Sequence, residues 1–87
     1  MKFNLEIHRK ALKFLEKLNE DAKGRILEKI KKLRETPFLP EAVKIQGRKE
    51  ELYRIRVGNY RILYYIDQQS STIFILKVDK RPRVYRK

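Results

Sequence analysis

Apolar residues in the N-terminal half of the chain recur at two different spacings. Phe3 to Ile7 alternates apolar and polar side chains, as a half-buried strand does. Asn19 can cap a helix, and Pro37 stops one, because the residue before a proline avoids helical dihedral angles. Two helix-spaced stripes lie between these signals, at Ala11, Leu12, Phe14, Leu15 and Leu18 and at Ala22, Ile26, Leu27, Ile30 and Leu33. The pattern predicts a strand and then a helical hairpin whose apolar faces need a sheet to cover them.

The C-terminal half reads as strands. Runs of strand type occupy about 52–57, 60–66 and 72–79, and residues 43–45 are a candidate short strand. Gly58-Asn59 separates the first two runs, and a two-residue loop with glycine first fits a type I′ or II′ hairpin turn. No linker divides the chain. We therefore predict one domain over residues 1–87, of α+β class, with an antiparallel-dominated sheet of about four strands packed against the N-terminal helical hairpin.

A two-residue turn fixes the register of the predicted hairpin. Arg56 then lies directly opposite Arg61, and Ile55 opposite Ile62. Because side chains alternate between the faces of a sheet, one face is predicted to join the core and the other to carry the arginines. The predicted core face holds Tyr53, Ile55, Val57, Tyr60, Ile62 and Tyr64, and the other face holds Leu52, Arg54, Arg56, Arg61, Leu63 and Tyr65.

The opposed arginines are the informative pair. Like charges at facing positions are mildly destabilising, so a fold tends to avoid them unless an anion lies between. Arginine forks match phosphate oxygens well. One interpretation is a phosphate-binding face. The other is a solvated face whose arginines pair with Asp or Glu elsewhere in the chain.

Charge supports a polyanionic or acidic partner. The net charge is +12, and residues 44–87 hold 12 basic and 4 acidic side chains against 11 and 7 in residues 1–43. The chain has no cysteine and one histidine, His8, which we interpret as a surface or capping residue. We expect no metal and no cofactor. No segment reads as a membrane span or a signal peptide, so a cytoplasmic protein without membrane association is the default.

The C-terminal segment extends the basic character. Residues 77–87 carry six basic side chains and one acid. Tyr85 lies among them and can serve as a platform on which a base stacks. Pro82 argues against a helix here, so the segment is expected to lie extended beside the sheet.

The residues Leu52-Tyr-Arg-Ile-Arg-Val-Gly-Asn-Tyr-Arg-Ile-Leu-Tyr64 and Val78-Asp-Lys-Arg-Pro-Arg-Val-Tyr85 resemble the RelE/ParE toxin superfamily of toxin–antitoxin systems. The resemblance covers nearly the whole chain, and RelE-like members are the most similar. It implies a RelE-like microbial ribonuclease-type fold and a ribosome-dependent endoribonuclease that cuts messenger RNA in the A site. Such enzymes use the 2′-OH of the RNA as nucleophile, without a metal, and leave a 2′,3′-cyclic phosphate and a 5′-OH.

The resemblance also implies roles for individual residues. Arg61 and Arg81 match arginines that stabilise phosphate, and Tyr85 matches a tyrosine for base stacking or proton transfer. Arg56 and Arg54 stand where RelE enzymes often have lysines, and because arginine stays protonated it is a poor general base. The expected catalytic set is Arg61, Arg81, Tyr85 and Arg56, and the expected RNA-binding set is Arg54, Lys80, Arg83 and Lys77.

The resemblance implies partners as well, namely messenger RNA on the ribosome and an acidic RelB-like antitoxin. The toxin alone is expected to be monomeric and to form a hetero-oligomer with the antitoxin. Two alternatives stay open. One is a ParE-like toxin that inhibits gyrase, and the other is a non-catalytic RNA-binding or ribosome-binding domain.

Overall fold

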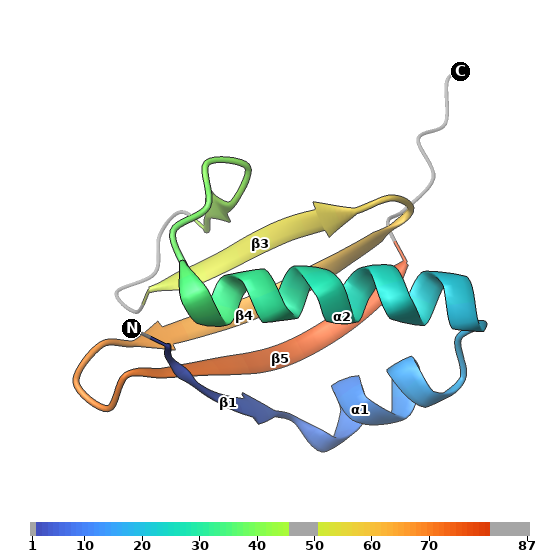
Figure 1. Ribbon diagram of the computed structural model, residues 1–87, viewed down its shortest axis with the longest axis horizontal. Coiled ribbons are helices and arrows are strands. Elements are labelled where there is room, and N and C mark those ends of the chain that lie inside the picture. Colours follow the sequence, from blue (N-terminus) through green and yellow to red (C-terminus); the bar gives the residue numbers. More distant parts are fainter. Residues whose placement is uncertain (1, 46–50, 81–87) are drawn as a thin grey trace.

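The computed structural model describes residues 2–45 and 51–80. Figure 1 shows α2 lying across one face of a twisted sheet, with α1 beside it near the end of β1. This arrangement confirms the predicted α+β class with a helical hairpin on the sheet. The elements in chain order are β1 (Asn4–Ile7), α1 (Arg9–Glu16), α2 (Glu20–Glu35), β2 (Val43–Lys44), β3 (Leu52–Val57), β4 (Tyr60–Asp67) and β5 (Thr72–Lys80).

The sheet has five strands in the order β1-β5-β4-β3-β2. β1 runs parallel to β5, whereas β2, β3, β4 and β5 pair antiparallel along the sheet. The antiparallel-dominated prediction is confirmed, but the strand count was one too low. The difference is β2, whose Val43 and Lys44 pair with Arg54 and Tyr53. The structure thus confirms the candidate short strand at residues 43–45, which the count of about four strands had left out.

Both helices begin at a residue whose side chain caps them. The imidazole Nδ1 of His8 accepts a hydrogen bond from the backbone N–H of Lys10 at 3.0 Å, which confirms His8 as a capping residue. Asn19 Oδ1 accepts from the N–H of Ala22 at 2.8 Å, as predicted. The second helix ends at Glu35, and Thr36 is its C-cap residue before Pro37. Within the described ranges, neither helix is long and apolar enough to cross a membrane.

The core lies between the helices and the sheet. Ala11 and Leu15 of α1 are buried there. The other buried apolar side chains include Ile26, Ile30 and Leu33 of α2 and Ile55, Ile62, Tyr64, Ile73 and Ile75 of the sheet.

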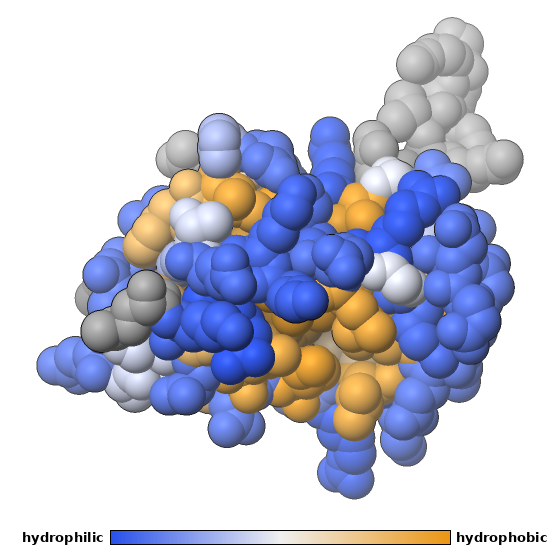
Figure 2. Space-filling view, in the orientation of Figure 1, coloured by the Kyte–Doolittle hydropathy of each residue, from blue (hydrophilic) through white to orange (hydrophobic). Residues whose placement is uncertain are grey.

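The predicted helix stripes were too wide at Leu12 and Leu27, which are 44% and 45% exposed. Each of them follows a buried residue by one position and therefore points about 100° away from it around the helix. A helix that packs on a sheet buries a stripe only about 100° wide, so these two side chains fall outside it. Figure 2 shows apolar side chains at the surface of the face that bears α2.

The hairpin of β3 and β4 has the predicted register. Arg56 pairs with Arg61, Ile55 with Ile62, and Val57 with Tyr60. Gly58 has φ +58°, and Asn59 is not among the residues with positive φ, so the turn fits type II′ rather than I′. The predicted core face is confirmed as well, because its six side chains are buried or packed against the core.

The end of α2 is joined to the sheet through Tyr64. This side chain is fully buried, and its hydroxyl donates a hydrogen bond to the Pro37 carbonyl oxygen at 3.1 Å. Burial raises the pKa of Tyr64 far above its ordinary value of 10.0. The phenol therefore remains a hydrogen-bond donor at every physiological pH.

Candidate nucleic-acid interface

Basic side chains from three strands meet on the sheet face that is turned away from the helices. One row across the strands is Arg54, Leu63 and Lys77, and the next is Arg56, Arg61 and Asp79. Members of a row share a face because paired residues point the same way. Together with Ile45, five of these six side chains, Arg56 excepted, line a depression of about 190 Å³. We call this depression the cationic pocket.

A β-bulge in β5 brings two of its residues into this pocket. Leu63 pairs with Lys77 but Tyr64 pairs with Ile75, so Leu76 is an extra residue without a partner on β4. A regular strand would turn Lys77 to the same face as Ile75, into the core. The bulge reverses the alternation, so that Val78 is buried and Lys77 and Asp79 lie on the outer face.

Among the residues that the structure describes, Asp79 is the only carboxylate that lines the pocket. Arg61 Nε donates to Asp79 Oδ1 at 2.9 Å, and Arg61 Nη2 lies 3.4 Å from Oδ2. Lys77 Nζ is 3.7 Å from Oδ2. The hydrogen bond that Arg61 donates to Asp79 raises the pKa of Arg61 above its already high ordinary value.

This ion pair changes the argument made from the opposed arginines. The expectation was that Arg56 facing Arg61 calls for an anion between them. The carboxylate of Asp79, on the neighbouring strand, pairs with Arg61 and offsets the repulsion between Arg56 and Arg61. The paired interpretation therefore holds for Arg61. Within residues 2–45 and 51–80, three cations, Arg54, Arg61 and Lys77, share the pocket with a single carboxylate, which leaves an excess of positive charge for a phosphate.

The remaining predicted site residues are distributed differently. Arg56 is exposed beside the pocket in the row of Arg61. Lys80 pairs with Tyr60, whose ring packs against the core, so Lys80 lies on the helix-bearing side of the sheet and not in the pocket. Arg81, Arg83 and Tyr85 lie outside the described residues.

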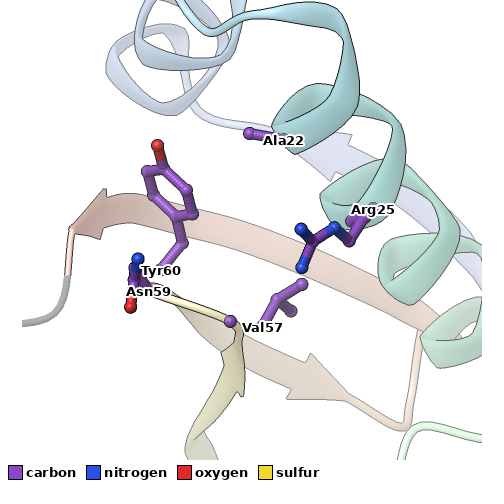
Figure 3. Close-up of a pocket in the computed structure, with 6 residues that line it drawn as sticks. Ala22, Arg25, Val57, Asn59 and Tyr60 are labelled. Atoms are coloured by element: carbon purple, nitrogen blue, oxygen red, sulfur yellow. The ribbon is translucent and has the colours of Figure 1, made fainter.

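A second, smaller depression lies where α2 meets the β3–β4 turn, as Figure 3 shows. Its volume is about 120 Å³, and Ala22, Arg25, Val57, Gly58, Asn59 and Tyr60 line it. The Arg25 guanidinium reaches over the turn, so that a Cβ added at Gly58 would lie 3.2 Å from its Nη1. Arg25 also pairs with Asp21 at 3.1 Å. Here one paired arginine contacts a turn, so this depression lacks the excess charge of the cationic pocket.

A helical hairpin on one face of a mainly antiparallel sheet, with a basic pocket on the other, defines a RelE/ParE-type toxin domain. The model of the family described as ParE toxin of the type II toxin–antitoxin system parDE matches residues 5–85, so the chain belongs to this toxin superfamily. The putative toxin RelE1 of Methanocaldococcus jannaschii is similar in sequence, with 34% identity over 99% of this chain and 98% of that protein.

Solved structures agree. The toxin chain in the archaeal RelE–RelB complex of Pyrococcus horikoshii superposes with a TM-score of 0.86 at 32% identity, covering 97% of this chain and 100% of that one. The isolated RelE toxin of Escherichia coli superposes with a TM-score of 0.83 over 94% of this chain and 87% of that one, and at 24% identity it is a likeness of fold. This protein is a type II toxin of RelE type.

Proposed function

We propose that this toxin is a ribosome-dependent endoribonuclease that cuts messenger RNA in the A site. The observation that carries the proposal is the cationic pocket, where Arg54, Arg61 and Lys77 converge from three strands on the sheet face that the helices leave uncovered. Arginine forks bind phosphate oxygens in a bidentate manner, and charge fixed in place before the reaction stabilises charge that develops in the transition state.

The proposed reaction is an internal transfer within the RNA. The 2′-oxygen attacks the adjacent phosphorus as its proton leaves, the bond to the 5′-oxygen breaks, and that oxygen takes up a proton. The products are a 2′,3′-cyclic phosphate and a 5′-OH. Arg61 and Arg81 would stabilise the negative charge on the phosphorane, Arg56 would assist them, and Tyr85 would stack on a base or transfer a proton.

The other basic residues would follow the RNA backbone. Arg54 and Lys77 line the cationic pocket and would contact phosphates next to the scissile one. Arg83 and Lys80 would contact more distant phosphates. Because Lys80 lies on the helix-bearing side, the RNA or the ribosome would have to extend around the end of β5 to contact it. These contacts position the RNA without reading its sequence.

We further propose that an acidic RelB-like antitoxin neutralises this toxin in the cytoplasm. The relatives from Pyrococcus horikoshii and Mycobacterium tuberculosis were crystallised as toxin–antitoxin complexes. A chain of net charge +12 complements an acidic partner. The toxin alone would be a monomer that joins a hetero-oligomer with its antitoxin.

The test is to express the toxin in a translation extract and to map RNA 5′ ends by primer extension. We expect cuts within the A-site codon of translated messenger and none in the same RNA without ribosomes. Arg61→Ala should lower cleavage about 100-fold, the usual cost of one stabilising donor. Arg9→Ala, which removes an exposed arginine at the start of α1, is the matched control and should cut like the unaltered toxin. Intact messenger would refute the proposal.

Gyrase inhibition is the second candidate, because the matching family model is that of ParE toxins. It predicts a block of supercoiling and DNA damage while messenger RNA stays whole. A supercoiling assay with purified gyrase separates the two activities. A toxin that binds RNA with steep salt dependence but yields no cut product would instead be a non-catalytic RNA-binding domain.

A further inference from the structure

Asp79 occupies the position on Arg61 that a phosphate would occupy. Its two carboxylate oxygens lie 2.9 Å from Nε and 3.4 Å from Nη2 of the guanidinium. A guanidinium fork presents the same pair of N–H groups to a carboxylate as to a phosphate. An RNA phosphate can therefore use the Nε–Nη2 edge of Arg61, the edge that Asp79 occupies, only after Asp79 has given it up.

The surroundings make this pair stronger than an ordinary surface pair. The side chains of Arg61 and Asp79 are 32% and 27% exposed, whereas those of the Arg25–Asp21 pair are 64% and 79% exposed. Partial burial reduces screening by solvent and salt. If Asp79 lost its contact with Arg61, it would still have a cationic partner, because Lys77 Nζ lies 3.7 Å from Asp79 Oδ2. The Lys77 side chain is 65% exposed. Asp79 can therefore be transferred from Arg61 to Lys77 without becoming an unpaired charge.

We propose that Asp79 is a resident counter-ion that a substrate phosphate replaces on Arg61, and that it determines specificity by holding the affinity for free RNA low. RNA presented by the ribosome is held in place and can complete the exchange, whereas free RNA has to compete with the carboxylate unaided. This inference rests on the proposed function, since it assumes that the cationic pocket binds RNA phosphate.

The experiment measures binding of the full toxin to a single-stranded RNA oligonucleotide whose 2′-positions are methylated, so that it cannot be cut. We expect Asp79→Asn to tighten binding about two- to fivefold, the ratio that corresponds to losing a partly screened ion pair. The slope of log affinity against log salt should become steeper by about 0.7, because removal of one carboxylate leaves one more uncompensated cation to neutralise phosphate. Asp21→Asn is the matched control, because it removes the same charge from an Arg–Asp pair on the helix side, and it should change binding little.

Two further variants separate the possible failures. If Arg61→Ala leaves RNA binding unchanged, the phosphate contact of the proposed function is wrong. If Arg61→Ala weakens binding but Asp79→Asn does not tighten it, only the counter-ion role is refuted. The double variant Arg61→Ala/Asp79→Asn should bind no better than Arg61→Ala, because the gain is expected to pass through Arg61.

One readout needs no variant and remains valid if the variants fold poorly, and a second separates the counter-ion role of Asp79 from a role in proton transfer. In the unaltered toxin, addition of the same RNA should shift both the Nε–H resonance of Arg61 and the carboxyl carbon resonance of Asp79. An Asp79 resonance that stays in place while Arg61 shifts overturns the proposal. The proposal is also overturned if the Asp79→Asn toxin loses cleavage on the ribosome while its RNA affinity is unchanged, because Asp79 would then act as a proton acceptor.

Discussion

The hydrogen bond from the Tyr64 hydroxyl to the Pro37 carbonyl fixes the end of α2 onto the sheet, and Tyr64→Phe removes it alone. The ring is fully buried, so its packing is retained in the variant. A net hydrogen bond contributes about 0.5–1.5 kcal/mol, and an acceptor that loses its buried partner adds to the loss. We expect the free energy of unfolding to fall by about 1–2 kcal/mol. For a domain of this size each kcal/mol lowers the melting temperature by about 4–8 °C.

Denaturant unfolding followed by circular dichroism measures this loss. Tyr65→Phe is the matched control, because Tyr65 lies on the other face of the same strand and its hydroxyl has no hydrogen-bond partner among the described residues. A loss for Tyr64→Phe no larger than that for Tyr65→Phe would refute the reasoning.

The pH dependence gives a second check on Tyr64. Because burial raises the folded-state pKa of Tyr64 above the ordinary 10.0, only the unfolded chain ionises as the pH rises past 10. The stability of the unaltered protein should therefore decline there relative to Tyr64→Phe. A difference between the two proteins that stays constant above pH 10 would contradict the assigned burial.

Three further predictions concern single residues. Gly24→Ala should stabilise the protein by about 0.5–1 kcal/mol in thermal unfolding, because Gly24 is an exposed position inside α2 and a Cβ there meets nothing within 4 Å. Gly58→Ala should destabilise it by about 1–2 kcal/mol in the same assay, because φ at Gly58 is +58° and the new Cβ would crowd Arg25. Lys29 donates a hydrogen bond to Glu41 at 2.8 Å, which lowers the pKa of Glu41 below its ordinary 4.5. The stabilisation from this pair is therefore present above pH 4.5 and disappears as the pH falls through the lowered pKa. The melting temperatures of Glu41→Gln and the unaltered protein should differ at pH 7 and converge at low pH.

The hairpin could be predicted from sequence because its determinants are local. Gly58-Asn59 fixes the loop length, and the loop length fixes that Arg56 faces Arg61. Alternation then assigns every side chain of the two strands to a face. The helix caps at His8 and Asn19 are local in the same sense, since each acts on backbone groups two or three residues ahead.

The composition of the cationic pocket could not be predicted in this way. The bulge at Leu76 changes which side chains of β5 reach the outer face, and a single inserted residue has no periodic signal. The burial pattern of β5 reveals the bulge once the structure is known: Ile73 and Ile75 are buried at odd-numbered positions, whereas Val78 is buried at an even-numbered one. Without the bulge, Asp79 would not have been placed beside Arg61.

The most direct test of the central claim, that this pocket serves RNA cleavage, is the chemistry of the RNA ends made in a translating extract. The account predicts A-site cuts that carry a 2′,3′-cyclic phosphate upstream and a 5′-OH downstream, with a loss of about 100-fold for Arg61→Ala. End labelling by polynucleotide kinase without prior phosphatase detects the 5′-OH. Cuts that carry 5′-phosphates, or cuts made equally well by Arg61→Ala, would contradict the account.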